Sequence, residues 1–348
     1  MTSTFFKETA RTLVALGIAF IVALIVIFAT SADPGKALST LLTAPFSSPR
    51  NIGLWVDEVA KLTLTGLAFS LVFQAKQFSM GVQGQVYVGG LCAALVALSP
   101  IGATPLAIPA GMAAGMIGGA AYGFIPGYAK AKFGASEIVS SLMLNYIAIK
   151  MVNYTVRAHL APTGSGQLAS ESFPSSAVLP ILSGTRFDIG ILIALVVTGL
   201  VWFLLYRTSY GLKLRLVGDN ANFAEYAGIR SNVIMVSAMT ISGAIGGLLG
   251  SLFVQGRAGQ IAIDFDGNLA FEGILIAIVA KSRPLAVPFV AMGYGYLRQG
   301  AQFMGFRTDV PTEMIAVVQA IIILLVASSF TMPGRKFFAR IFGKGPAA

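Results

Sequence analysis

Residues 188–206 of the chain read DIGILIALVVTGLVWFLLY, and no charged residue follows Asp188 in this stretch. A helix that crosses the hydrocarbon core of a bilayer needs about 20 largely apolar residues. The whole chain repeats this character, because 56% of its residues are hydrophobic and only 11% are charged. A soluble domain carries about 25% charged residues. We therefore expect an all-α integral membrane protein.

Apolar segments of similar length recur on both sides of this stretch. Ten candidate spans fall approximately at 12–30, 53–75, 86–100, 105–125, 137–155, 188–206, 233–254, 267–281, 284–301 and 312–330. Several are short or interrupted by glycine, so we expect broken helices among them. The first apolar run, residues 13–29, is longer than the core of a signal peptide and no small-residue cleavage site directly follows it. We expect it to stay as the first span of a single transmembrane domain, residues 1–348.

Lysines and arginines predict the orientation, because cytoplasmic loops carry an excess of them. If the N-terminus is inside, the inner loops hold most of the 24 basic residues, and few, Arg298 among them, fall in outer loops. Both termini are then cytoplasmic, residues 156–187 form the larger outer loop, and residues 207–232 form the largest inner loop. The net charge of +10 does not indicate binding to nucleic acid, because the basic residues are scattered between apolar spans and form no basic stripe.

The inner loop contains the pattern of a short helix. Asn220 can accept a backbone hydrogen bond and cap a helix that begins near Ala221, and Gly228 can end it about two turns later. Phe223 and Tyr226 supply apolar anchors. Such a helix suits a groove on a partner protein, and it equally suits the lipid interface. The residues alone do not separate these two interpretations.

Polar residues within or beside the apolar segments are candidates for a solute pathway. Gln83 and Gln85 flank Gly84 in an expected helix break, where exposed backbone must lie beside protein or water. Asn145 is expected to face the bundle interior, either as an interhelical hydrogen-bonding group or as pathway lining. Asp264 and Asp266 are expected to be solvated in an outer loop.

The residues that enzymes need are missing from the sequence. It contains no G-x-x-x-x-G-K-[ST] phosphate loop, no H-E-x-x-H and no G-x-S-x-G. His159, the one histidine, falls in the outer loop, and Cys92, the one cysteine, falls in an apolar run. A catalytic triad would therefore lack its base, and a metal site would lack its ligands. We expect no enzymatic activity, no cofactor and no metal.

Three ordered motifs resemble the permeases of ABC importers for branched-chain amino acids, simple sugars and nucleosides. RLVGDNANFAEYAGI (215–229) is similar to the coupling loop of that class. KAKFGASEIVSSLMLNYIA (130–148) and LAFSLVFQAKQFSMGVQGQ (67–85) are similar to two of its other segments, and FEGILIAIVAKSRPLAVPFVA (271–291) is a weaker match. Ser79 and Gln83 stand where the family usually has Asn and Glu, so the resemblance does not support a cation at Gln83.

The resemblance implies an α-helical importer fold with about ten spans, in a bacterial inner membrane. It implies a second, often non-identical permease subunit, two cytoplasmic ATPase domains that hydrolyse the ATP, and a periplasmic or lipid-anchored binding protein. The "MLNYIA" variant is most similar to permeases for nucleosides and related purines, with simple sugars second. The residues expected to couple to the ATPase are Arg215, Gly218, Asn220, Ala224, Tyr226, Ala227 and Gly228. The residues expected along the substrate pathway are Phe78, Gln83, Gln85 and Asn145.

Three other functional classes remain as alternatives. An ion-coupled secondary transporter would need ion-coordinating groups at the bilayer midplane, and the central spans offer few. A membrane enzyme would need the catalytic cluster that is missing. A simple channel would leave the patterned inner loop, residues 207–232, without a role.

Overall fold

The computed structural model describes residue 28 and residues 33–162, 168–180 and 189–308. The chain divides into two compact units, one of Phe46–Tyr296 and the other of Met1–Pro45 with Leu297–Ala348. The expected span at 312–330, and that at 12–30 apart from Phe28, lie outside the described residues.

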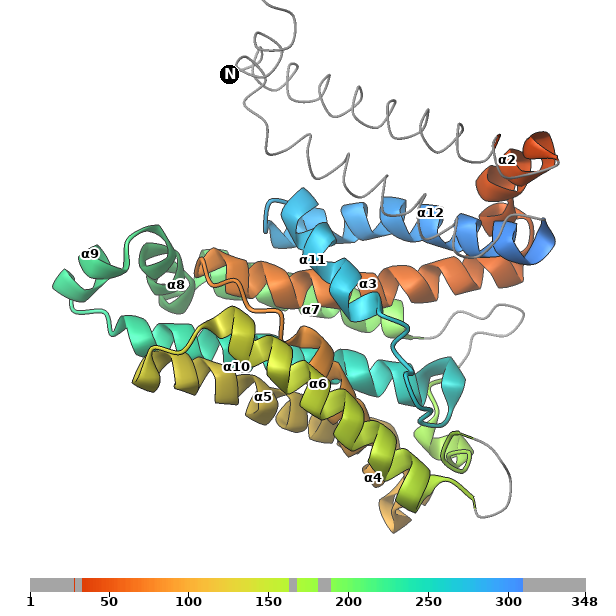
Figure 1. Cartoon of the computed structure of the whole chain (residues 1–348), viewed down its shortest axis with the longest axis horizontal. Coiled ribbons are helices and arrows are strands. Elements are labelled where there is room, and N and C mark those ends of the chain that lie inside the picture. Colours follow the sequence, from red (N-terminus) through yellow and green to blue (C-terminus); the bar gives the residue numbers. More distant parts are fainter. Residues whose placement is uncertain (1–27, 29–32, 163–167, 181–188, 309–348) are drawn as a thin grey trace, which may run out of the picture. The chain divides into compact units, whose positions relative to one another are not determined.

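The larger unit is built from helices (Figure 1). They are α3 (Pro49–Gln74), α4 (Val82–Leu98), α5 (Ala107–Phe133), α6 (Glu137–Thr155), α7 (Gly190–Arg207), α8 (Ser209–Asp219), α9 (Ala221–Tyr226), α10 (Ser231–Phe253), α11 (Leu269–Val279) and the first part of α12 (Val287–Arg307). Each of the eight candidate spans that fall within the described residues coincides with one of these helices. The inner-loop residues fold into α8 and α9.

Three described helices are long and apolar enough to cross a membrane: α5, α7 and the segment Ser231–Ala258, which is α10 with the π-helical turn η5 (Val254–Ala258). The helix α11 and the segment Pro284–Arg307 meet at a bend of 116°, as in a broken span or a re-entrant loop. The helix α4 is apolar but shorter. Short and broken helices are therefore present, and the total of about ten spans stays a prediction.

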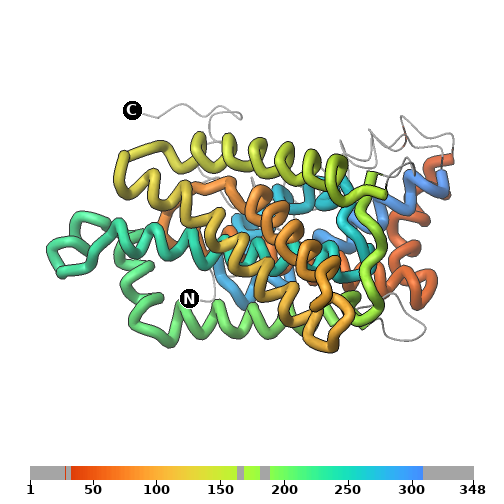
Figure 2. The backbone as a smooth tube through the Cα atoms, turned by 90° about the horizontal axis from the view of Figure 1, so that it is seen from below, coloured from red at the N-terminus to blue at the C-terminus, as the bar shows by residue number. Residues whose placement is uncertain are grey.

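The closest helix packing in the larger unit is a three-helix contact between α4, α5 and α10 (Figure 2), while the largest share of its buried apolar residues comes from α3. Glycines recur every fourth residue on the face of α5 that meets α10. A Cβ atom on Gly115 would lie 2.8 Å from the Gly247 carbonyl oxygen, and one on Gly123 would lie 2.6 Å from that of Met239. A Cβ on Gly89 of α4 would overlap the backbone of Gly247. The three backbones approach closely because no side chain separates them, as is common between membrane helices.

The smaller unit contains α2 (Pro34–Thr43) and the last part of α12. Asp33 caps α2, since its side chain accepts a hydrogen bond from the Lys36 amide at 3.1 Å. Ala37 and Leu41 of α2 pack against Ala301 and Met304 of α12.

Two positions in the outer segments differ from the sequence-based expectation. Arg298, expected in an outer loop, lies inside α12. The predicted outer loop is partly ordered, because residues 168–179 run antiparallel to residues 255–263. Amides of Ser170, Phe173 and Leu179 donate to the carbonyls of Ile261, Gly259 and Gln255, at 2.8, 2.7 and 2.7 Å. Backbone pairing therefore gives structure to a segment whose composition predicts only an irregular loop.

The glycine contact predicts a sharp difference between two Gly→Ala variants. A methyl group in Gly119→Ala would overlap the Gly243 backbone, whereas Gly199 on α7 has nothing within 4 Å of an added Cβ. Overpacking a close contact costs about 1–3 kcal/mol, and an exposed helical Gly→Ala gains up to about 1 kcal/mol. Thermal unfolding in detergent should therefore give a lower Tm for Gly119→Ala and an unchanged or higher Tm for Gly199→Ala. Equal midpoints would contradict the packing.

Candidate functional site

The predicted inner loop, residues 207–232, contains α8, which lies against the end of α3. Its buried face carries Gly211, Leu214, Val217 and Gly218. A Cβ atom on Gly218 would overlap the carbonyl oxygen of Gln74, the last residue of α3. Glycine at position 218 therefore lets the two helices meet backbone to backbone.

The cap of α9 at its N-terminus has the predicted geometry. Asn220 is the N-cap, and its Oδ1 accepts a hydrogen bond from the Phe223 amide at 3.1 Å. This satisfies one of the free amides that every helix leaves at its start.

The C-terminus of α9 is closed by a Schellman motif. The Ile229 amide donates to the Ala224 carbonyl and the Gly228 amide donates to the Glu225 carbonyl, each at 2.9 Å. Gly228 has φ +77°, a conformation that side chains disfavour. The Ser231 hydroxyl also donates to the Ala221 carbonyl at 3.2 Å, which ties α9 to the start of α10. A short helix is thus held rigidly at both ends.

One face of α9 is free in the isolated chain. Ala224 is fully buried, whereas the Tyr226 side chain is 93% exposed and Phe223, three residues earlier, is also exposed. Figures 1 and 2 place α9 at one end of the unit, where it projects beyond its neighbours. Ala227 and Gly228 are exposed beside it.

The remaining predicted coupling residue, Arg215, lies on α8 and faces α7. Its guanidinium lies over the Tyr206 ring, 5.0 Å from the centroid, and its Nε donates to the Gly211 carbonyl at 3.3 Å. Tyr210, also on α8, shares a hydrogen bond of 2.9 Å with Ser237 of α10. Burial raises the pKa of the Tyr210 phenol, so it stays neutral and can make this bond. Both contacts fix α8 to the helices around it.

Two contacts connect this loop with the rest of the unit through Gln74. The Gln74 backbone contacts α8, and its Nε2 donates to the Ser282 carbonyl at 2.8 Å. Ser282 lies in the bent turn between α11 and α12, where Lys281 and Ser282 both have positive φ. The nearby pair of Lys76 and Asp219, 3.7 Å apart, is exposed and contributes little.

The helix break lies slightly earlier than expected. Residues 75–81 separate α3 from α4, and Gly84 belongs to the first turn of α4. Asn145 of α6 clamps this segment: its Oδ1 accepts from the Gly84 amide at 2.8 Å and its Nδ2 donates to the Met80 carbonyl at 2.7 Å. Ser141 accepts from the Met80 amide at 3.0 Å. Asn145 is only 2% exposed, so both ends of its amide act within the chain.

The expectation that Asp266 is solvated is wrong, because it is only 4% exposed. Its carboxylate accepts hydrogen bonds from Gln83 Nε2 at 3.2 Å and from the Tyr87 hydroxyl at 2.9 Å. Both donors lie on α4, so the carboxylate finds in the interior the polar partners that water would otherwise supply. Asp264, by contrast, is exposed. Nothing in composition alone separates these two aspartates, which stand two residues apart.

The other predicted pathway residues are divided between interior and surface. Gln85 is buried against Gly246, and within the described part of the chain its Oε1 has no hydrogen-bond partner. Phe78 is exposed and stacks on Phe73, with ring centroids 5.3 Å apart. Glu137 and Glu272 lie in the first turns of α6 and α11, and Glu137 pairs with Lys130 at 2.6 Å.

A row of exposed polar side chains on α6, set among exposed apolar ones such as Met143, Ile147 and Met151, is a feature that the sequence did not single out. Tyr146, Lys150 and Tyr154, spaced four residues apart, lie on one side of this helix and are exposed. Among the described residues no carboxylate pairs with Lys150. The exposed large side chains of α7 between Leu192 and Phe203 are all apolar by comparison.

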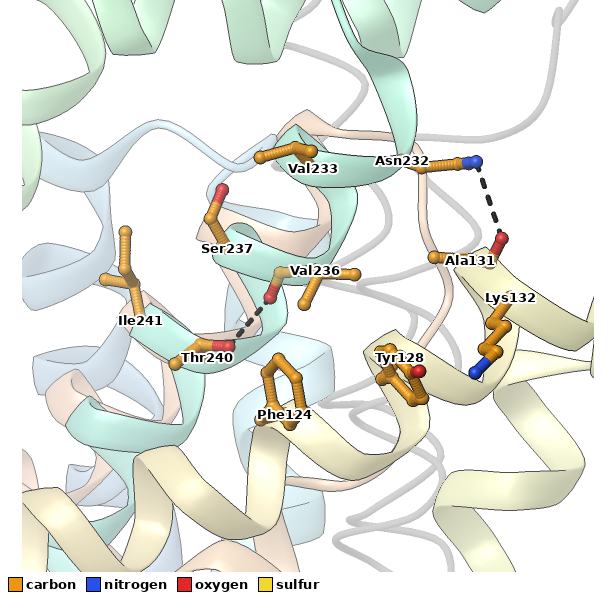
Figure 3. Close-up of a pocket in the computed structure, with 10 residues that line it drawn as sticks. All are labelled: Phe124, Tyr128, Ala131, Lys132, Asn232, Val233, Val236, Ser237, Thr240 and Ile241. Atoms are coloured by element: carbon orange, nitrogen blue, oxygen red, sulfur yellow. Dashed lines mark hydrogen bonds between the residues drawn. The ribbon is translucent and has the colours of Figure 1, made fainter.

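A groove of about 720 Å³ lies between α5 and α10 (Figure 3). Phe124, Val236 and Ile241 give it an apolar lining. Lys132 and Asn232 border it, and Asn232 Nδ2 donates to the Ala131 carbonyl at 3.4 Å. Such a lining suits hydrocarbon and offers a polar solute few partners.

Comparisons with known proteins agree with this architecture. Residues 52–327 match the family model "Branched-chain amino acid transport system / permease component". The chain is 32% identical to the guanosine ABC transporter permease protein NupP of Bacillus subtilis (strain 168), over 84% of this chain and 86% of the relative. It is 28% identical to the nucleoside ABC transporter permease protein NupB of Lactococcus lactis subsp. cremoris (strain MG1363), over 91% and 90%.

A further relative carries a different substrate name. The chain is 24% identical to the glucose ABC transporter permease protein TsgB13 of Haloferax volcanii, over 88% of this chain and 83% of the relative. No solved structure matches the chain. The family model covers most of the chain, including every helix from α4 to α12. The chain therefore belongs to the family of branched-chain amino acid transport system permease components.

Proposed function

We propose that this chain is one of two permease subunits of an ABC importer in a bacterial inner membrane, and that it carries a nucleoside or related purine inward. The observation that carries the proposal is α9, a rigid, projecting helix with an exposed aromatic face, in a chain of the permease family. The names of two relatives, one for guanosine and one for nucleosides, support the substrate class. A simple sugar is the second candidate, from the glucose relative.

In this proposal α9 docks into a groove on a cytoplasmic ATPase. Phe223 and Tyr226 are the anchors, and their exposure leaves them free to enter such a groove. The caps at Asn220 and Gly228 hold α9 in shape, so displacement of the ATPase moves the helix as a unit.

Movement of α9 then reaches the membrane helices through α8. The backbone contact of Gly218 with Gln74 passes it to the end of α3, and the bond from Gln74 to Ser282 passes it to the turn before α12. The break at 75–81 follows α3 directly and is clamped to α6 by Ser141 and Asn145. ATP-loaded and ATP-free ATPases bind the loop differently, and this difference shifts the permease between two gate states.

The exposed face of α6 supplies the solute pathway, between this chain and a second permease subunit. Tyr146 lies at the middle of α6 and Lys150 about one turn later. A lysine exposed to lipid within a span is unfavourable, whereas a water-filled path accommodates it. Aromatic rings such as Tyr146 and Tyr154 can stack on a purine base. Phe78 lies two residues before the clamp between Met80 and α6. Asn145 then holds α6 to the start of α4 from inside the chain, while Gln83 of α4 holds Asp266.

We predict that Gly228→Val uncouples transport while leaving insertion intact. A β-branched residue at φ +77° costs about 1–3 kcal/mol against the docking conformation, which lowers uptake by about fivefold or more. Radiolabelled guanosine uptake by vesicles that hold the whole transporter measures this. The matched control is Gly134→Val, which places the same strain (φ +64°) at the end of α5. If both variants lose transport equally, the specific role of α9 is contradicted.

The same assay separates the importer from an ion-coupled transporter. An ABC importer is inhibited by vanadate and continues when an uncoupler collapses the ion gradient while ATP is supplied. Uptake that resists vanadate and stops with the uncoupler would instead support the secondary transporter.

We predict that cysteines on the α6 face react with a membrane-impermeant thiol reagent. With Cys92→Ala removing the native thiol, Tyr146→Cys and Lys150→Cys should be labelled, and guanosine should slow the labelling. The matched control is Leu200→Cys on α7, where the native side chain is 60% exposed and lies among apolar residues; it should stay unlabelled. If both α6 positions are as unreactive as the Leu200→Cys control, the pathway does not run along α6.

A further inference from the structure

A second cavity, of about 420 Å³, lies where the end of α7 meets the turn before α12. Its walls come from Trp202 and Tyr206 of α7, from Arg283 in the turn, and from Leu285 and Phe289 beyond it. Apart from Arg283, the lining is aromatic or apolar. The cavity therefore combines an apolar interior with one cation at its wall.

Two more arginines contact aromatic residues that line this cavity. The Arg207 guanidinium lies over the Trp202 ring, 5.6 Å from the centroid, and the Arg215 guanidinium lies 5.0 Å from that of Tyr206. Within the described residues, none of the three arginines forms an ion pair with a carboxylate. One cation thus lines the cavity and two more lie over rings of its lining residues, and none of the three has a carboxylate partner within the described residues.

We propose that this cavity binds an anionic phospholipid of the inner leaflet. The phosphodiester lies among Arg283, Arg207 and Arg215, and the acyl chains lie against Phe289 and Trp202. Guanidinium groups bind phosphate oxygens in pairs, and basic pockets between membrane helices on the cytoplasmic side suit anionic head groups. The larger groove between α5 and α10 fits this ligand less well, because its one lining cation is a lysine, Lys132, and within the described residues no arginine lies over the rings that line it.

The site has a consequence for the coupling loop. Arg215 lies on α8, and the cavity borders the turn that receives the hydrogen bond from Gln74. A lipid bound there bridges α7, α8 and the turn, so it stabilises one position of the coupling loop. The inner-leaflet location rests on the proposed orientation, but the binding itself does not.

Fluorescence of Trp202 tests the proposal directly, because the chain has only two tryptophans. In a Trp55→Phe variant, Trp202 is the sole reporter. The full chain is placed in symmetric nanodiscs of phosphatidylcholine that contain either brominated phosphatidylglycerol or brominated phosphatidylcholine at the same mole fraction. Brominated acyl chains quench a tryptophan that they touch. We expect stronger quenching by the phosphatidylglycerol, and this readout needs neither transport nor a defined orientation.

Charge variants separate a built site from general surface charge. Removing one cation near an anionic surface costs about fivefold in binding, so Arg283→Gln should reduce the phosphatidylglycerol preference by about that factor. Arg283→Lys should retain part of it, which separates loss of charge from misfolding. Lys132→Gln is the matched control and should leave the preference unchanged. Equal quenching by the two lipids, or an equal effect of Lys132→Gln and Arg283→Gln, would overturn the proposal.

Discussion

The close approach of α4, α5 and α10 is the constraint on which the larger unit depends. Glycines at the crossing points remove the side chains that would hold the backbones apart, as at Gly115 and Gly247. Each helix then positions a functional element: α10 carries α9 at its start, α5 leads into α6, and α4 holds Asp266 through Gln83 and Tyr87. Helices packed this closely have little room to slide past one another, so they move together.

Against this rigid core, the polar contacts mark where the unit can change shape. The segment 75–81 and the turn around Ser282 have non-helical backbone, and side-chain amides, those of Asn145 and Gln74, hold both in place. Breaking and re-forming a few hydrogen bonds of this kind costs less free energy than separating a packed helix interface. In the proposed mechanism, the coupling loop acts on these two segments, while the glycine core transmits the movement without deforming.

Much of this arrangement follows from local sequence. Apolar runs predict each described span, and Asn220 and Gly228 predict the ends of α9, because capping depends on neighbouring residues alone. The partners of Asp266 and Gln74 could not be predicted, because they lie on helices that are distant in sequence. The buried side of α6 could not be predicted either. The sequence shows Tyr146 and Lys150 among apolar residues, but the buried side is decided by the contact of Asn145 with Met80. The predicted position of the helix break was also wrong by several residues, because the hydrogen bonds from Asn145 and Ser141 decide where α4 begins.

The central claim is that α9 docks on a separate ATPase. A photoreactive amino acid at position 226, in native membranes that contain the whole transporter, tests it most directly. The Tyr226 side chain is almost fully exposed, so the probe does not disturb the fold. If α9 docks on an ATPase, illumination should crosslink this chain to an ATP-binding subunit. A probe at the apolar, exposed Leu200 of α7 should give no such crosslink. Crosslinks from position 226 that reach only lipid would contradict it.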